Sequence, residues 1–169
     1  MSEPTLARAW LVAARDERVV AELEGIYGFI AAAVESRGPA CWASGRCCNF
    51  EAVGHRLYVT GLEAAYTVAR LPSPNPHVGT APGLNLPVLS TATLVSARVS
   101  GGCPFQVKNL CGIHAIKPLG CRVYFCDRSA KQWQEELSEA TLAQVRSLHN
   151  RYGIEYRYGE WRQMLAAFV

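Results

Sequence analysis

Seven cysteines are the residues of this chain best suited to chemistry, and their spacing divides them into two groups. The first group has the pattern C-x5-C-C and the second C-x7-C-x9-C-x4-C. Thiolates are soft ligands that suit zinc and iron–sulfur clusters, so we expect a metal centre, with either one site shared by both groups or two sites. The expected ligands are Cys41, Cys47, Cys48, Cys103, Cys111, Cys121 and Cys126.

Three other roles for these cysteines compete with metal binding. Isolated buried cysteines behave as small apolar side chains, which would account for one or two of the seven. A disulfide framework is disfavoured by the odd number of cysteines and by an N-terminal sequence that does not have the pattern of a signal peptide. A thiol redox switch is disfavoured because no CxxC pair is present. We therefore expect a cytoplasmic location, where thiols stay reduced.

Composition and charge disfavour several other classes of function. The 169 residues carry 17 basic and 14 acidic side chains, a net charge of +3, and the basic residues are scattered. This pattern disfavours a nucleic-acid surface, and no apolar run is long enough to cross a membrane. We also find no GxGxxG, P-loop, HExxH or GxSxG motif.

The elements that must position the cysteines are mostly helical in our prediction. Apolar periodicity predicts helices over 5–36, with Asp16 as the cap of a second helix, and over 131–152 and 159–168. Thr60 and Glu63 form a capping box that begins a helix running to about Leu71. Strands are predicted over 55–59 and 89–99, a Pro-rich loop over 72–88, and short strands and turns over 103–126.

These elements predict an α+β fold, mainly α-helical, with a few short strands and irregular metal-binding cysteine loops. We expect a single domain spanning residues 1–169. Its parts would be an N-terminal helical segment (1–36), a metal-binding core (41–126) and C-terminal helices (131–169).

The second cysteine group, read with its neighbours, resembles the YkgJ-like cysteine-cluster family of zinc- or iron-chelating domains, to which a flagellin lysine methylase is related. That family has the pattern CxxCxxCC, then a Cys-Pro element, then C-x-I-Y-x-x-R-P-x-x-C-R-x-F-x-C. The resemblance covers roughly residues 41–126 and is densest over the last three cysteines, which it implies are ligands. The matching residues of the second group are Cys103, Pro104, Phe105, Cys111, Ile113, Pro118, Cys121, Arg122 and Cys126.

Three departures of the chain from this family pattern bear on a metal site. Ser44 stands where the first motif has its second cysteine, so one sulfur is lost and either that ligand is dispensable or a metal position is open. His114 replaces the Tyr and could be a nitrogen ligand or a half-buried loop residue, and Lys117 replaces the Arg. Lys117 and Arg122 could offset the negative charge of clustered thiolates.

We therefore expect a metal-binding protein that holds an iron–sulfur cluster, such as a 4Fe–4S cluster, in redox chemistry, sensing or an accessory step of a modification pathway. Seven sulfurs exceed what one tetrahedral zinc needs. One alternative is a structural zinc module that binds a protein partner. Another is a metal-dependent protein-modifying enzyme, such as a methyltransferase acting on a protein substrate. The sequence indicates neither the catalytic residues nor the oligomeric state.

Overall fold

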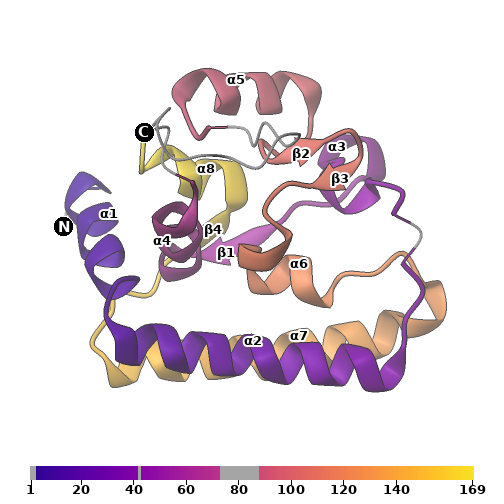
Figure 1. Ribbon diagram of the computed structural model, residues 1–169, viewed down its shortest axis with the longest axis horizontal. Coiled ribbons are helices and arrows are strands. Elements are labelled where there is room, and N and C mark those ends of the chain that lie inside the picture. Colours follow the sequence, from indigo (N-terminus) through magenta and orange to yellow (C-terminus); the bar gives the residue numbers. More distant parts are fainter. Residues whose placement is uncertain (1–2, 42, 73–87) are drawn as a thin grey trace.

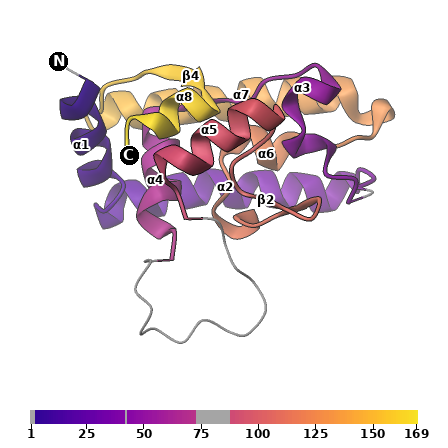
Figure 2. The ribbon, with the colours of Figure 1, turned by 90° about the horizontal axis from the view of Figure 1, so that it is seen from above.

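A computed structural model of the chain describes residues 3–41, 43–72 and 88–169. Two long helices, α2 (Glu17–Arg37) and α7 (Lys131–Arg151), run side by side along one edge of the molecule (Figures 1 and 2). The helix α2 begins at Asp16, whose carboxylate accepts the backbone N–H of Arg18, and ends at Gly38 in the left-handed conformation. Both ends have the caps that the sequence indicates.

The second helical unit packs on the other side of the core. The helix α1 (Glu3–Ala13) lies against α4 (Gly61–Arg70), which begins with the predicted Thr60–Glu63 capping box. A Cβ at Gly61 would clash with the ring of Trp10, so only glycine allows the two helices to approach this closely. The strand β1 (Tyr58–Thr60) pairs antiparallel with β4 (Tyr158–Glu160), which leads into α8 (Trp161–Ala166).

The predicted strand over 89–99 is wrong, because this segment forms the helix α5 (Thr91–Ser100). Its β-branched residues favoured a strand. Ser90 and Thr93 instead form a reciprocal cap at the helix start, and the buried Leu94 and Ala97 lie one turn apart on the same helix face. This segment packs against α8, and the contact outweighs the strand propensity of its β-branched residues.

Short elements make up the cysteine-bearing part of the chain. They are η1 (Arg46–Cys48), α3 (Phe50–Val53), β2 (Gln106–Val107), β3 (Leu110–Cys111), η2 (His114–Ile116), α6 (Leu119–Val123) and η3 (Arg128–Ala130). The segment 103–126 is therefore more helical than the predicted strands and turns. With its two small antiparallel sheets, the fold confirms the predicted mainly helical α+β class.

The core joins both helical units, with Trp10, Leu23, Phe50, Phe105 and Trp161 among its fully buried side chains. His149 on α7 is also fully buried, in contrast to the solvated position that its place near a helix end suggests. Among the described helices none is long and apolar enough to span a membrane. Most of the predicted loop 72–88 lies outside the described residues, and the single-domain organisation stays a prediction.

Candidate metal centre

Two cysteine segments that are far apart in sequence lie against each other. The Cys103 N–H donates to the Cys48 carbonyl over 2.8 Å, and the Gln106 side-chain amide donates to the Gly45 carbonyl over 3.1 Å. Gly45 has φ +70°, and a Cβ there would lie 2.7 Å from the Gln106 amide nitrogen. The close approach of the two segments thus depends on a glycine at this position.

A tight hairpin places Cys111. The strands β2 and β3 pair Gln106 with Cys111 and Val107 with Leu110, leaving Lys108 and Asn109 as the two-residue turn. Both turn residues have positive φ, at 48° and 66°, as expected for a type I′ hairpin. The hairpin turns the chain back so that Cys111 faces the cavity that also contains Cys47 and Cys48.

Buried Glu63 holds the helix that carries Cys121. One carboxylate oxygen accepts the N–H of Leu119, the first residue of α6, over 2.8 Å, and also the Tyr27 hydroxyl over 3.4 Å. The other oxygen accepts the N–H and the hydroxyl of Thr60. Burial raises the pKa of Glu63, and these four donors oppose that effect. The cap of α4 therefore also fixes the start of α6.

Four thiols form what we call the inner group, Cys47, Cys48, Cys103 and Cys111. The Cys47 and Cys48 sulfurs are 4.0 Å apart. Interaction with Cys48 is the main cause that lowers the pKa of Cys47 to about 6, that of Cys111 to about 7, and that of Cys103. The pKa of Cys48 is raised through its contacts with the other three, first Cys103 and then Cys111. Shared protons of this kind favour thiolates, the form that binds metals.

The remaining cysteines lie around this group. Cys121 on α6 has a pKa raised by burial and by the charges of Cys103 and Cys111. Cys126 contacts Ser44, with its sulfur 3.7 Å from the Ser44 hydroxyl oxygen, and Cys41 is exposed. Ser44 thus lies beside a cysteine of the second group, while His114 on η2 is 3.0 Å from the Lys117 ammonium.

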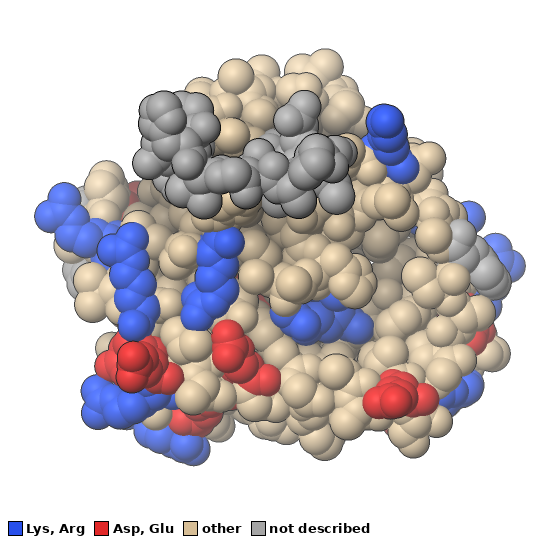
Figure 3. All heavy atoms as spheres, in the orientation of Figure 1, with Lys and Arg blue, Asp and Glu red and all other residues tan. Residues whose placement is uncertain are grey.

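A cavity of about 650 Å³ connects these side chains. Six of the seven cysteines line it, all except Cys103, and its opposite wall is the apolar face of α2 with Ile30, Ala31 and Val34. Figure 3 shows this side of the molecule as a largely uncharged surface with basic side chains set in a hollow above α2. A second cavity of about 480 Å³, bordered by α7 and Tyr58, shares Cys47, Cys121 and Tyr124 with the first.

Two cationic side chains line the cavity that the cysteines also line. The Lys117 ammonium lowers the pKa of both Cys47 and Cys111 through its charge. Arg122 donates to the carbonyls of Lys117 and Ala115 and lies over the Tyr27 ring at 4.0 Å. Within the described part of the chain neither cation has an ion pair with a carboxylate. Lys117 is placed to offset the charge of thiolates.

The donor set suits a thiolate-bound metal, although its side chains are not arranged as ligands. Among residues 3–41, 43–72 and 88–169, no group of three or more Cys, His, Asp or Glu side chains has the geometry to hold a metal ion. Two sulfurs at ~2.3 Å from one tetrahedral zinc would lie about 3.8 Å apart, near the 4.0 Å of Cys47 and Cys48. A metal would require rotation of the other side chains of the inner group.

The sequence motifs did not indicate that Trp161 and Glu63 support the cysteine site. Trp161, expected to pack the last helix, is fully buried, and its indole also lowers the pKa of Cys103. Glu63 was identified as a helix cap, but its bond to Leu119 joins segments 56 residues apart. Only the burial of these side chains could have singled them out. Of the other histidines, His55 is half-buried and stacks on Tyr124, and His77 lies outside the described residues.

In comparisons with known proteins, no protein-family model, no curated protein and no solved structure matches this chain. The resemblance to the YkgJ-like family therefore stays a prediction from the cysteine pattern.

Proposed function

We propose that this protein binds a metal centre through its cysteines, with the inner group as its main ligands. The observation that carries this proposal is a cavity lined by six of the seven cysteines. These cysteines come from two separate segments, which the Cys103 N–H joins by its bond to the Cys48 carbonyl, and the sulfurs of Cys47 and Cys48 are 4.0 Å apart. Apolar packing alone gives no reason for four thiols to gather beside unpaired cations.

An iron–sulfur cluster is the leading candidate for this centre. Six cysteines line one cavity of about 650 Å³, more sulfur and more room than a single tetrahedral ion requires. Such a cluster would supply one-electron chemistry. Lys117 and Arg122, which line the same cavity, would stabilise its negative charge. These supports favour a role in redox chemistry or sensing.

A structural zinc site is the second candidate, favoured by the 4.0 Å spacing of Cys47 and Cys48. In that case the metal would tie the short cysteine-bearing elements together, and the protein would serve as a module for a protein partner. Zinc has no redox chemistry and its sites are colourless, so metal content and visible absorption distinguish the two candidates.

The test is elemental analysis with visible absorption spectroscopy on protein purified without oxygen. Iron with acid-labile sulfide and broad visible absorption would support the cluster, and one or two zinc ions in a colourless protein would support the structural site. Protein that contains neither metal, and that binds neither on reconstitution with iron and sulfide or with zinc, would contradict the proposal. Cys48→Ala is the matched variant, and it should lose the metal while Cys41→Ala keeps it.

A further inference from the structure

The cavity of about 650 Å³ has one wall that carries no sulfur, the face of α2 between residues 27 and 34. The side chains that line this wall are Tyr27, Ile30, Ala31 and Val34. At a helical rise of about 1.5 Å per residue, the wall is roughly 10 Å long. Leu110, which is 61% exposed, and Phe125 add further apolar surface to the cavity. A metal held by the cysteines would leave this apolar part of the cavity unused.

Two positive charges lie in the same cavity without a negative partner. Both Lys117 and Arg122 line it. The described residues include all 14 acidic residues of the chain, and none of their carboxylates forms an ion pair with either cation. The cavity therefore favours an anionic occupant.

Both cations keep hydrogen-bond donors for such an anion. Arg122 uses Nε and Nη2 to donate to the carbonyls of Lys117 and Ala115, over 2.8 and 2.9 Å, and its guanidinium lies 4.0 Å from the centre of the Tyr27 ring. These contacts hold the group in place and leave Nη1 without a hydrogen bond to the described residues. The Lys117 ammonium has three donors and lies 3.0 Å from Nε2 of His114. Each cation can thus still donate to a carboxylate oxygen.

The acidic residue of the cavity lies away from Arg122. Glu35 also lines the cavity, about two helical turns and roughly 12 Å along α2 from Tyr27, over which the guanidinium lies. The intervening wall is apolar. Small-molecule sites commonly have this composition, with volumes of roughly 300–1,000 Å³, mostly apolar walls and a few polar groups that fix the orientation of the ligand.

We propose that this cavity binds a small organic acid, a carboxylate with an apolar body. The carboxylate contacts Lys117 and Arg122, and the body lies against the α2 wall. This site goes beyond the proposed metal centre and does not require a metal, although an acid bound there would lie beside the cysteines.

The experiment uses octanoate as the probe, with 1-octanol and acetate as matched controls. Octanol has the same apolar body without the charge, and acetate has the same head group without the body. Isothermal titration calorimetry on the purified protein should show octanoate binding at least about 10-fold more tightly than either control, because it combines a charged hydrogen bond with apolar burial. Octanol binding as tightly as octanoate would overturn the assignment of an anionic ligand.

A charge variant tests the head-group contact. Lys117→Met keeps a long side chain and removes the ammonium, so the Kd of octanoate should rise by about 10-fold while that of octanol stays the same. The matched control is Arg56→Met, which removes a cation that lines the second cavity and should leave octanoate binding unchanged.

A second variant tests the apolar wall without removing a buried group. Ala31 is exposed on α2, so Ala31→Phe should fold and fill part of the cavity, and it should weaken octanoate and octanol alike. Octanoate binding at wild-type affinity in both Lys117→Met and Ala31→Phe would overturn this inference and leave the metal centre untouched. Protein that binds octanoate as expected but neither zinc nor iron with sulfide would support this inference and overturn the metal centre alone.

Discussion

The cysteine face and the opposite end of the molecule are built from elements of different length and are held by different contacts. We define the cysteine face as residues 41–50 and 101–126, and the distal end as α1, the start of α2, the end of α7 and residues 152–157. At the distal end the Trp10 indole and His149 Nδ1 both bond to backbone carbonyls, and Arg151 pairs with Glu22 over 2.6 Å. On the cysteine face the elements are two to five residues long, and the thiols interact mainly with one another, with Lys117 and with Ser44.

This difference indicates which region would gain stability from the proposed metal. Long helices with buried apolar stripes are stable through their own packing. Segments of a few residues gain little from propensity and need an additional tie. A metal would supply that tie on the cysteine face, and its loss should leave the distal end intact.

The largest expected effect separates Cys48 from Cys41. Cys48→Ser removes the sulfur at the centre of the inner group, and we expect zinc affinity to fall by roughly 100-fold or more, beyond the cost of losing an outer-shell partner. Cys41→Ser alters an exposed side chain at the edge of the cavity and should have a much smaller effect. Metal titration checks both, and equal losses would show that the inner group has no special role.

Metal removal should affect the two regions unequally. At a free metal concentration of 100 Kd, binding contributes ~2.7 kcal/mol, which corresponds to roughly 100-fold in amide protection. After chelation we expect that loss for residues 41–50 and 101–126, and little change in α1 and the start of α2. Hydrogen exchange with mass spectrometry measures it, and a uniform change would contradict the division into two regions.

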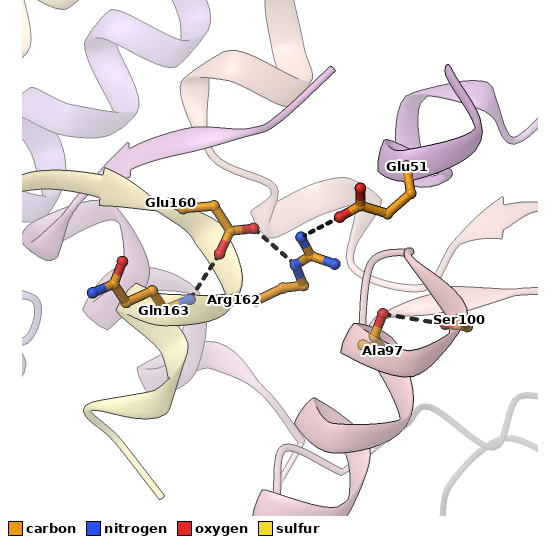
Figure 4. Close-up of polar contacts among 6 residues, drawn as sticks. All are labelled: Glu51, Ala97, Ser100, Glu160, Arg162 and Gln163. Carbon is orange, nitrogen blue, oxygen red and sulfur yellow. Dashed lines mark hydrogen bonds and ion pairs between the residues drawn. The ribbon is translucent and has the colours of Figure 1, made fainter. Parts of the chain in front are cut away.

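Arg162 joins the cysteine face to α8. Its guanidinium is 8% exposed and lies between Glu160 at 2.8 Å and Glu51 at 3.1 Å (Figure 4). Glu51 in turn donates its N–H to the Gly101 carbonyl, just before the second cysteine group. Arg162→Met should lower the free energy of unfolding by about 2 kcal/mol, since charged hydrogen bonds at a buried group are lost.

The matched control for this change is Arg151→Met. It breaks an exposed ion pair at the distal end and should cost less than about 1 kcal/mol. Urea unfolding of the metal-free proteins compares the two variants. Similar losses would show that the ion pairs of Arg162 add nothing beyond a surface pair.

The smallest expected effect is a pH dependence at the distal end. Burial lowers the pKa of His149, whose Nδ1 donates to the Ile154 carbonyl while Nε2 is buried without a partner. Near pH 6 the His149 side chain therefore binds a proton in the unfolded chain but stays neutral in the folded protein. Unfolding free energy should be undiminished above about pH 6.5, the ordinary histidine pKa, and fall as the pH drops below it.

His149→Gln removes this titration and should flatten the pH profile between pH 7 and 5. The experiment uses metal-free protein, because metal affinity also falls as the pH drops and would add a second pH dependence to the unfolding free energy. An unchanged profile in the variant would assign the acid sensitivity to other groups.

Local signals determined the parts of the fold that could be read from sequence. Asp16, Gly38 and the Thr60–Glu63 box place helix ends correctly because a cap acts within three or four residues. The error at 89–99 arose where local signals conflict, since Val and Thr favour a strand while the caps and the contact with α8 favour a helix. Propensity is weak enough for packing to override it.

The seven cysteines and their spacing, which led to the prediction of a metal site, could be read from the sequence alone. Only the tertiary structure decided that Cys48 interacts with three other thiols, that Cys126 lies beside Ser44, and that Cys41 is exposed. It also brought the Trp161 ring to Phe105 and Glu63 to the start of α6. Such contacts depend on how whole helices pack, and side chains distant in sequence leave no periodic or motif signal of their meeting.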